Sequence, residues 1–310
     1  MAAAEHVATC EIAFKVDVCN HRALHDGVPG IAKILDAAGV PAAFFVAFGP
    51  DHSGRALRRV LRRGFLTKML RTRAPRMYGW RTLLYGTLLP APSVGESAPD
   101  LLRALERAGH EVGLHGFDHV RWHDGLLCMR DGEIRECQAR ACALFDAALG
   151  HPPRFSGAPA WQVSEPSLQV QDELGLDWAS DCRDGEPFYP EIAGRRLGTL
   201  QIPTTLPTSD EVLGAGSAKA GELAGWYSRR LDPRRLNVVG LHAEAEGLHF
   251  SRWFRDWLRE LRAAGARFVQ LSDVAVRERE RAPCRRVVLR AIPGRADAVA
   301  SPADAAVSPS

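Results

Sequence analysis

Two histidines lie four residues apart behind a short apolar run, in the segment EVGLHGFDHV at 111–120. On one face of a helical turn, this spacing would bring the imidazoles of His115 and His119 to a single metal ion. A catalytic metal ion usually has three protein ligands and one open position. The pair therefore predicts a third ligand elsewhere in the chain.

Other polar residues follow apolar stretches of strand length and are candidates for that ligand and for catalysis. They are Asp17, Cys19 and Asn20 in the first group, Ser180, Asp181 and Cys182 in the second, and His242, Glu244 and Glu246 in the third. In parallel α/β folds, the chemistry gathers where the strands end. Taken singly, a histidine is more often structural, and an aspartate often caps a helix. Together these residues predict a mononuclear metal hydrolase.

The elements that must position these residues alternate along most of the chain. We expect strands at 11–18, 42–48, 111–115, 236–243 and 267–271, and shorter ones around 154–156, 176–179 and 200–202. Helical patterns separate them, for example at 28–39, 98–110 and 131–150. Repeated β–α units predict a parallel α/β fold, either a barrel or an open sheet. The chain has no dinucleotide fingerprint or P-loop that would favour a nucleotide-binding sheet.

The composition is that of an ordinary globular chain, with 310 residues, 46% hydrophobic and 25% charged. A net charge of +3 is too small to predict a nucleic-acid partner. We expect no transmembrane helix and no secretory signal, because the chain has no sufficiently long apolar run and no basic start followed by an apolar core. Seven cysteines without a CxxC pair predict reduced thiols.

One stretch is strongly basic: residues 55–81 carry ten basic residues and no acidic one, interleaved with apolar and aromatic side chains. This pattern is typical of an interfacial helix whose cations meet anionic headgroups. A solvated basic helix is the plainer alternative, and a nucleic-acid site has weak support without a recognised module. We expect residues of about 55–90 to contact a membrane surface.

The domain organisation follows from these patterns. We predict an N-terminal extension at 1–10, one catalytic domain at 11–280 with a basic amphipathic insertion at about 52–92, and a tail at 281–310. The tail is rich in Ala, Pro and Ser, a composition that predicts disorder.

Several motifs together resemble the NodB-homology polysaccharide deacetylase superfamily. They are KVDV, HEVGLHGFDH, WASDCRDGEPF, QIPTTLPTSDEVLG and LHAEAEG, and they occur in the family's order between about residues 11 and 275. The segments GVPGIAKIL, FGPD and FLTKMLRTRAPRMYGW are most similar to the lipid A deformylases within that superfamily. The resemblance implies a distorted (β/α) barrel with one divalent metal ion.

The resemblance also implies roles for individual residues. Asp17 matches the catalytic base, His115 and His119 match two metal ligands, and His242 matches the general acid. Asp181 lies in the motif that orients this acid, and we assign Trp161, Arg183 and Glu244 to substrate binding. A formamide is a weak electrophile, so the metal would polarise its oxygen and acidify a bound water. Asp17 would take the proton of that water, and His242 would donate one to the departing nitrogen.

The substrate implied by the resemblance is undecaprenyl-phosphate-linked 4-deoxy-4-formamido-L-arabinose, hydrolysed to formate and the aminosugar lipid. That aminosugar later modifies lipid A and lowers the charge that polymyxin and other cationic antimicrobial peptides seek. A lipid carrier implies a peripheral location at the cytoplasmic side of the bacterial inner membrane. It would also explain the basic segment, whose cations would attract the phosphate and the membrane surface.

Two residues depart from the family pattern. Cys19 stands where the family has a metal-binding aspartate, and Gln162 follows Trp161 where the family has an arginine that braces the base. A thiolate with two imidazoles is a known zinc set and is less suited to magnesium or manganese, so we favour zinc. The alternatives are a catalytically impaired relative that binds the lipid carrier or a pathway partner, and a deacetylase of a related N-acyl sugar.

Overall fold

The fold is built on one parallel sheet, seen in a computed structural model that describes residues 6–7, 9–56 and 79–304. Within these residues, seven strands join in the order β10–β1–β2–β3–β4–β5–β8, and an eighth, β9, pairs with β1. The strands are β1 (Glu11–Val18), β2 (Ala43–Val46), β3 (Glu111–Leu114), β4 (Phe155–Ser156), β5 (Trp178–Ala179), β8 (Leu200–Gln201), β9 (Leu236–His242) and β10 (Arg267–Phe268). All their pairings are parallel.

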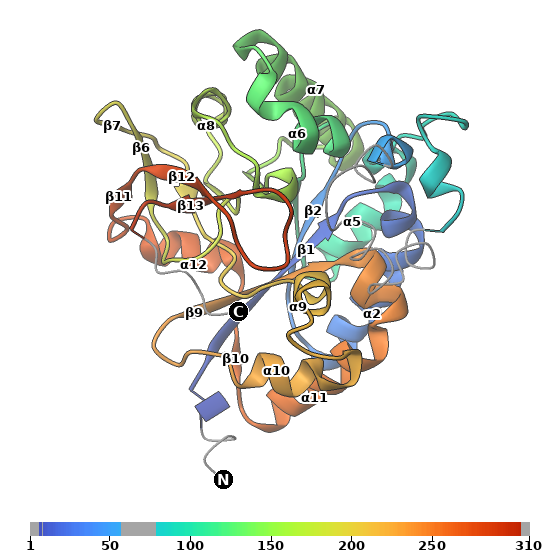
Figure 1. Cartoon of the computed structure of the whole chain (residues 1–310), viewed down its shortest axis with the longest axis vertical. Coiled ribbons are helices and arrows are strands. Elements are labelled where there is room, and N and C mark those ends of the chain that lie inside the picture. The colour runs from blue at the N-terminus through green and yellow to red at the C-terminus, as the bar shows by residue number, and fades with distance from the viewer. Residues whose placement is uncertain (1–5, 8, 57–78, 305–310) are drawn as a thin grey trace.

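The sheet curls until its two edges meet. The chain after β8 forms a parallel bridge to β9 between Leu206 and Val239, and the Thr205 amide donates to the carbonyl of Val238 over 3.0 Å. Figure 1 shows β1 and β9 lying side by side through the centre of the molecule. The predicted distorted (β/α) barrel is therefore confirmed.

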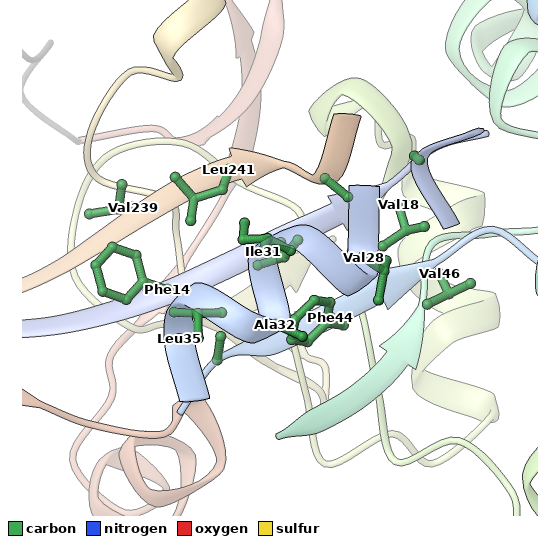
Figure 2. Close-up of a cluster of buried hydrophobic side chains, with 14 of the residues drawn as sticks. Phe14, Val18, Val28, Ile31, Ala32, Leu35, Phe44, Val46, Val239 and Leu241 are labelled. Atoms are coloured by element: carbon green, nitrogen blue, oxygen red, sulfur yellow. The ribbon is translucent and has the colours of Figure 1, made fainter. Parts of the chain in front are cut away.

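Helices cover the outside of this sheet. They are α2 (Val28–Ala38), α5 (Pro99–Arg107), α6 (His119–Gly125), α7 (Asp131–Leu149), α8 (Glu165–Glu173), α9 (Ser209–Ala215), α10 (Leu223–Ser228), α11 (Ser251–Ala263) and α12 (Leu271–Glu278). Two short π-helical turns, η1 (Ala23–Gly27) and η8 (Ala245–His249), precede α2 and α11. Figure 2 shows Ile31 and Leu35 of α2 beside strand side chains such as Phe14 and Phe44.

The side chains of β1 point alternately to the helix-covered core and to the interior of the barrel. Ile12, Phe14, Val16 and Val18 belong to the core between the sheet and the helices. Ala13 lies in the cluster inside the barrel, and Lys15 and Asp17 follow it at intervals of two. Because successive side chains of a strand point to opposite faces, all three point inward. The barrel interior therefore contains a lysine directly below an aspartate.

The prediction of a disordered tail at 281–310 was wrong for residues 281–304. The chain forms β11 (Cys284–Arg285), which pairs with β6 (Tyr189–Ile192), and a hairpin of β12 (Val287–Arg290) and β13 (Val299–Pro302). A short strand, β7 (Arg195–Arg196), pairs with β6. β13 is buried, and its Ala300 carbonyl accepts from the Arg183 amide over 2.7 Å. Composition missed this order because the order comes from contacts with distant parts of the barrel.

Part of the basic insertion lies outside the described residues, namely 57–78. The described part includes the 3-10 turn η3 (Thr82–Leu84) and the exposed side chains of Trp80 and Leu88. In the portion of the chain that the structure describes, no helix has the length and hydrophobicity needed to cross a membrane.

Candidate metal and catalytic site

The two histidines of the opening motif come from different elements. His115 follows the end of β3, Gly116 then turns the chain at φ +75°, and His119 begins α6. The predicted shared helical face was therefore wrong. The turn nevertheless brings the two imidazole centroids to 5.1 Å, because Asp118 caps α6 by accepting from the Arg121 amide.

Cys19 completes a cluster with these histidines. One ligand atom from each of Cys19, His115 and His119 lies within 4.8 Å of the other two. The Sγ of Cys19 is 3.6 Å from Nε2 of His115. The other ring nitrogen of His115, Nδ1, is 2.7 Å from the Gly157 carbonyl and must donate to it. That hydrogen bond leaves Nε2 of the neutral ring with its lone pair toward Cys19.

Burial sets the protonation of this cluster. Desolvation lowers the pKa of His115 to about 4, so its imidazole is neutral at pH 7. Desolvation also raises the pKa of Cys19 well above its usual value, and the carboxylates of Glu244 and Asp17 add to this effect. Cys19 would therefore lose its proton only on binding a cation.

Asp17 and His242 lie side by side at the ends of two paired strands, since they are register partners of β1 and β9. Asp17 is 4% exposed, and its Oδ1 lies 3.5 Å from Nζ of Lys15. Lys15 was not among the residues predicted for the site. A lysine inside an otherwise apolar strand, as in EIAFKVDV, was the available signal.

His242 faces an aspartate that differs from the predicted one. Its Nδ1 is 3.6 Å from Oδ1 of Asp210, a residue within the motif QIPTTLPTSDEVLG to which no role was assigned. Burial lowers the pKa of His242, but the carboxylates of Asp210, Glu244, Asp17 and Glu246 outweigh it and raise the pKa above its ordinary value. Asp210 therefore favours the protonated imidazole that a general acid requires.

The prediction that Asp181 orients His242 was wrong. Both oxygens of Asp181 are held elsewhere: Oδ1 accepts from the Ala158 amide, and Oδ2 accepts from the side-chain amides of Gln171 and Gln201. Among the described residues no hydrogen bond or ion pair joins Asp181 to His242, whose carboxylate partner is Asp210. Asp181 therefore secures the connections after β4 and β5.

Two residues assigned to substrate binding are almost completely buried. Trp161 is 1% exposed and donates from Nε1 to the Thr204 hydroxyl, while Arg183 is 2% exposed and pairs with Glu211 over 2.9 Å. The guanidinium of Arg183 lies 4.6 Å from the Trp161 ring. Both side chains are therefore buried packing residues that contact other parts of the chain. The prediction that they contact the substrate is corrected accordingly.

Glu244, the third residue assigned to substrate, lies closer to the reacting groups. Its Oε1 accepts from the Asn20 amide over 3.3 Å, and its buried Oε2 has no hydrogen-bond partner among the described residues. Burial raises the pKa of Glu244, an effect that His242 partly offsets. Its role toward substrate stays a prediction.

Comparison with known proteins decides the family. The polysaccharide deacetylase family profile matches residues 11–179, which is more than half of the chain. The chain belongs to the polysaccharide deacetylase family. Over 264 residues it is 31% identical to a protein of Shewanella sediminis named as a probable 4-deoxy-4-formamido-L-arabinose-phosphoundecaprenol deformylase ArnD, and the match covers 85% of each chain. A Wigglesworthia glossinidia brevipalpis protein of the same name is 29% identical over 87% of this chain and 94% of its own.

A solved structure supports the same family fold. The crystal structure of a polysaccharide deacetylase from Mycobacterium smegmatis superposes with a TM-score of 0.60 over 92% of this chain and 95% of its own, at 17% identity. As a polysaccharide deacetylase family member, the protein is a hydrolase of linear amide bonds.

The donor set of Cys19, His115 and His119 fits a divalent ion that accepts sulfur and nitrogen, because the three donors converge and His115 is neutral.

Proposed function

We propose that this protein hydrolyses the formamide of undecaprenyl-phosphate-linked 4-deoxy-4-formamido-L-arabinose and releases formate and the aminosugar lipid used to modify lipid A. The observation that carries the proposal is the convergence of Cys19, His115 and His119 beside the register pair of Asp17 and His242. The similarity to proteins named as deformylases supports this choice over other amides.

Each residue has a chemical task in this proposal. Cys19, His115 and His119 hold one divalent ion, with zinc favoured, and the ion when bound polarises the formamide oxygen and acidifies water. Asp17 accepts the proton of the attacking water. His242 donates a proton to the departing nitrogen, which is too basic to leave as an anion. Asp210 and the neighbouring carboxylates raise the pKa of His242 and so favour the protonated form that this step needs.

The lipid carrier would place the enzyme at the cytoplasmic surface of the inner membrane, where its product serves resistance to polymyxin and related peptides. In support, Trp80 is 69% exposed and Leu88 is 81% exposed in the described part of the insertion. Exposed large apolar side chains beside a basic stretch suit an interface with anionic lipid.

The test is formate release from a short-chain polyprenyl-phosphate formamido sugar. Metal-stripped protein would receive zinc, cobalt or manganese one at a time, with the matching acetamido sugar in parallel. We expect metal-restored formate release, strongest with zinc or cobalt, and much slower acetate release. His115→Ala should abolish turnover, whereas the exposed His249→Ala should leave it unchanged.

Three other results would contradict the proposal. Faster acetate release would identify a deacetylase of a related N-acyl sugar. Carrier binding without turnover under any metal would identify a catalytically impaired relative. Cys19 and Gln162, the two departures from the family pattern, are the residues that suggest this alternative. Full turnover by His115→Ala would exclude the metal site as the catalytic centre.

A further inference from the structure

Lys15 is a charged side chain sealed inside the barrel. It is fully buried and points inward from β1, one step below Asp17. Its register partners on the two neighbouring strands are Gly240 and Ala43, both small residues. A buried ammonium is costly unless it is paired, so its contacts should show why it is there.

The ammonium of Lys15 lies among four groups from different parts of the barrel. Its Nζ donates to the Ser180 carbonyl over 2.8 Å and lies 3.5 Å from Oδ1 of Asp17. It also lies 5.0 Å and 5.1 Å from the ring centroids of Phe45 and Trp161, within the range of cation–π attraction. One hydrogen bond and two rings hold the ammonium at a defined place, where it faces the carboxylate.

A second observation points to the same pair from the side of Asp17. Its Oδ1 is buried and has no hydrogen-bond partner among the described residues. A carboxylate oxygen sealed away from water without a donor is costly, and the cation at 3.5 Å is the feature that offsets this cost.

The other cations and amides near the site are engaged elsewhere. Arg183 and Arg295 both pair with Glu211. The Gln162 side chain donates to the Ala298 carbonyl over 2.6 Å and so holds the segment that leads into β13. Within the described part of the chain, Lys15 is the cation that forms an ion pair with Asp17.

We infer that Lys15 is a positioning residue for the base: its ammonium holds Oδ1 of Asp17 and directs the rest of the carboxylate to the attacking water. The inference rests on the proposed function for its catalytic consequence. The ion pair itself is a property of the folded chain and can be tested separately. Gly157 lies between Lys15 and the proposed metal site. A Cβ at this position would lie 3.2 Å from Nζ of Lys15, and the Gly157 carbonyl accepts the hydrogen bond from His115.

The catalytic test compares Lys15→Met, Lys15→Arg and the exposed control Lys33→Met. We expect Lys15→Met to lower kcat about 100-fold, the scale of a misplaced catalytic group, while KM changes less than about threefold. Zinc bound per chain should equal that of the wild type, since Lys15 touches none of the three ligands. Lys15→Arg should recover part of kcat, and Lys33→Met should match the wild type. A kcat within about threefold of wild type in Lys15→Met would overturn the inference.

The stability test works even if Lys15→Met is poorly folded or the wild type releases no formate. Thermal midpoints would be measured for Lys15→Met, Asp17→Asn and the double variant. A paired role predicts that the double variant is more stable than Lys15→Met alone, because it no longer carries an unpaired buried carboxylate. Additive losses would show that Lys15 acts independently of Asp17 and would refute the pair. If the wild type releases no formate but the double variant is still more stable than Lys15→Met, only the proposed reaction is refuted and the ion pair stands.

Discussion

At the scale of single residues, the acidity of His242 depends on the carboxylates around it. Asp210 is the carboxylate in direct contact, and it raises the pKa of His242 against the opposite effect of burial. In the proposed reaction His242 is the general acid, and a general acid works only while protonated, so activity should fall as the pH rises through this pKa.

Asp210→Asn should therefore shift the alkaline limb of the kcat profile to lower pH. We expect about a tenfold loss of kcat above neutral pH and a smaller loss as the pH falls, because a lower pH favours the protonated imidazole in both proteins. The measurement is kcat against pH for both proteins. Asp181→Asn is the matched comparison, since Asp181 does not contact His242 and should leave the position of that limb unchanged. An unchanged limb in Asp210→Asn would contradict the role given to Asp210.

In the proposed site, Cys19 is the ligand on which the metal preference depends. Its raised pKa means that a metal ion must displace a proton to bind the sulfur, so zinc affinity should increase with pH. Cys19→Asp replaces a soft ligand with a hard one and should move the preference from zinc toward manganese or magnesium.

We expect Cys19→Asp to weaken zinc binding by about 10-fold or more while formate release with manganese rises. Competition with a chelator measures the first change, and the formate assay measures the second. The partly buried Cys142→Ser should change neither. Equal metal preference in wild type and Cys19→Asp would mean that the thiol is not a ligand.

At the scale of elements, close backbone packing positions the turn η8, which follows His242 at the end of β9 and is preceded by Glu244. A Cβ at Gly30 of α2 would lie 2.1 Å from the Gly247 carbonyl of η8, and one at Gly27 would lie 2.4 Å from the Ala243 carbonyl. Only glycine permits this approach, because the neighbouring atoms are backbone and cannot rotate away. The contact fixes how closely η8 packs against α2, and η8 follows directly on Glu244.

Gly30→Ala should push η8 outward and cost about 1–3 kcal/mol of unfolding free energy, the usual cost of overpacking. Gly132→Ala in α7 is the control, because a Cβ at this exposed position would meet nothing within 4 Å among the described residues. It should be neutral or stabilising by up to about 1 kcal/mol. Urea unfolding measures both, and equal stabilities of the two variants would contradict the packing account.

The C-terminal segment is the other element that shapes the site. Arg295 pairs with Glu211, and Asp297 lies 3.2 Å from His123 of α6, so the loop between β12 and β13 joins α9 to α6. Figure 1 shows this loop, in red, crossing in front of the barrel. The segment therefore ties α9, which carries Asp210, to α6, which begins at His119, although its composition predicted disorder.

At the scale of the whole molecule, burial of ionisable groups links stability to pH. Burial raises the pKa of Glu246 to about 7, against the hydrogen bond from Ser209, the charge of His242 and the hydrogen bond from its amide. The ordinary value is 4.5, so between about pH 4.5 and 7 the folded protein keeps a proton that the unfolded chain has lost. Stability should therefore fall as the pH rises through this window.

Glu246→Gln should remove this part of the pH dependence. We expect it to be close to the wild type in stability at pH 5 and more stable relative to it at pH 8, by up to about 3 kcal/mol. Urea midpoints at the two pH values provide the measurement, with the exposed Glu136→Gln as control. If Glu246→Gln differs in stability from the wild type by the same amount at both pH values, Glu246 does not titrate as the structure indicates.

The sequence by itself determined the main strands and helices, the order in which polar residues follow them, and the family. Alternation along EIAFKVDV and the helical stripes are local consequences of burial, so they can be read without neighbours. Parallel strands gather their ends at one edge, and this rule was enough to predict that Asp17, Cys19, His115 and His242 would meet.

Only the tertiary structure decided which partner each residue receives. Asp210 faces His242 and Asp181 does not, because the curl of the barrel sets which connections end beside β9. Lys15 meets the Ser180 carbonyl across 165 residues of sequence, inside a barrel whose closure no local pattern describes. Side-chain pairing at such separations depends on strand curvature and packing, and these exist only once the sheet has closed.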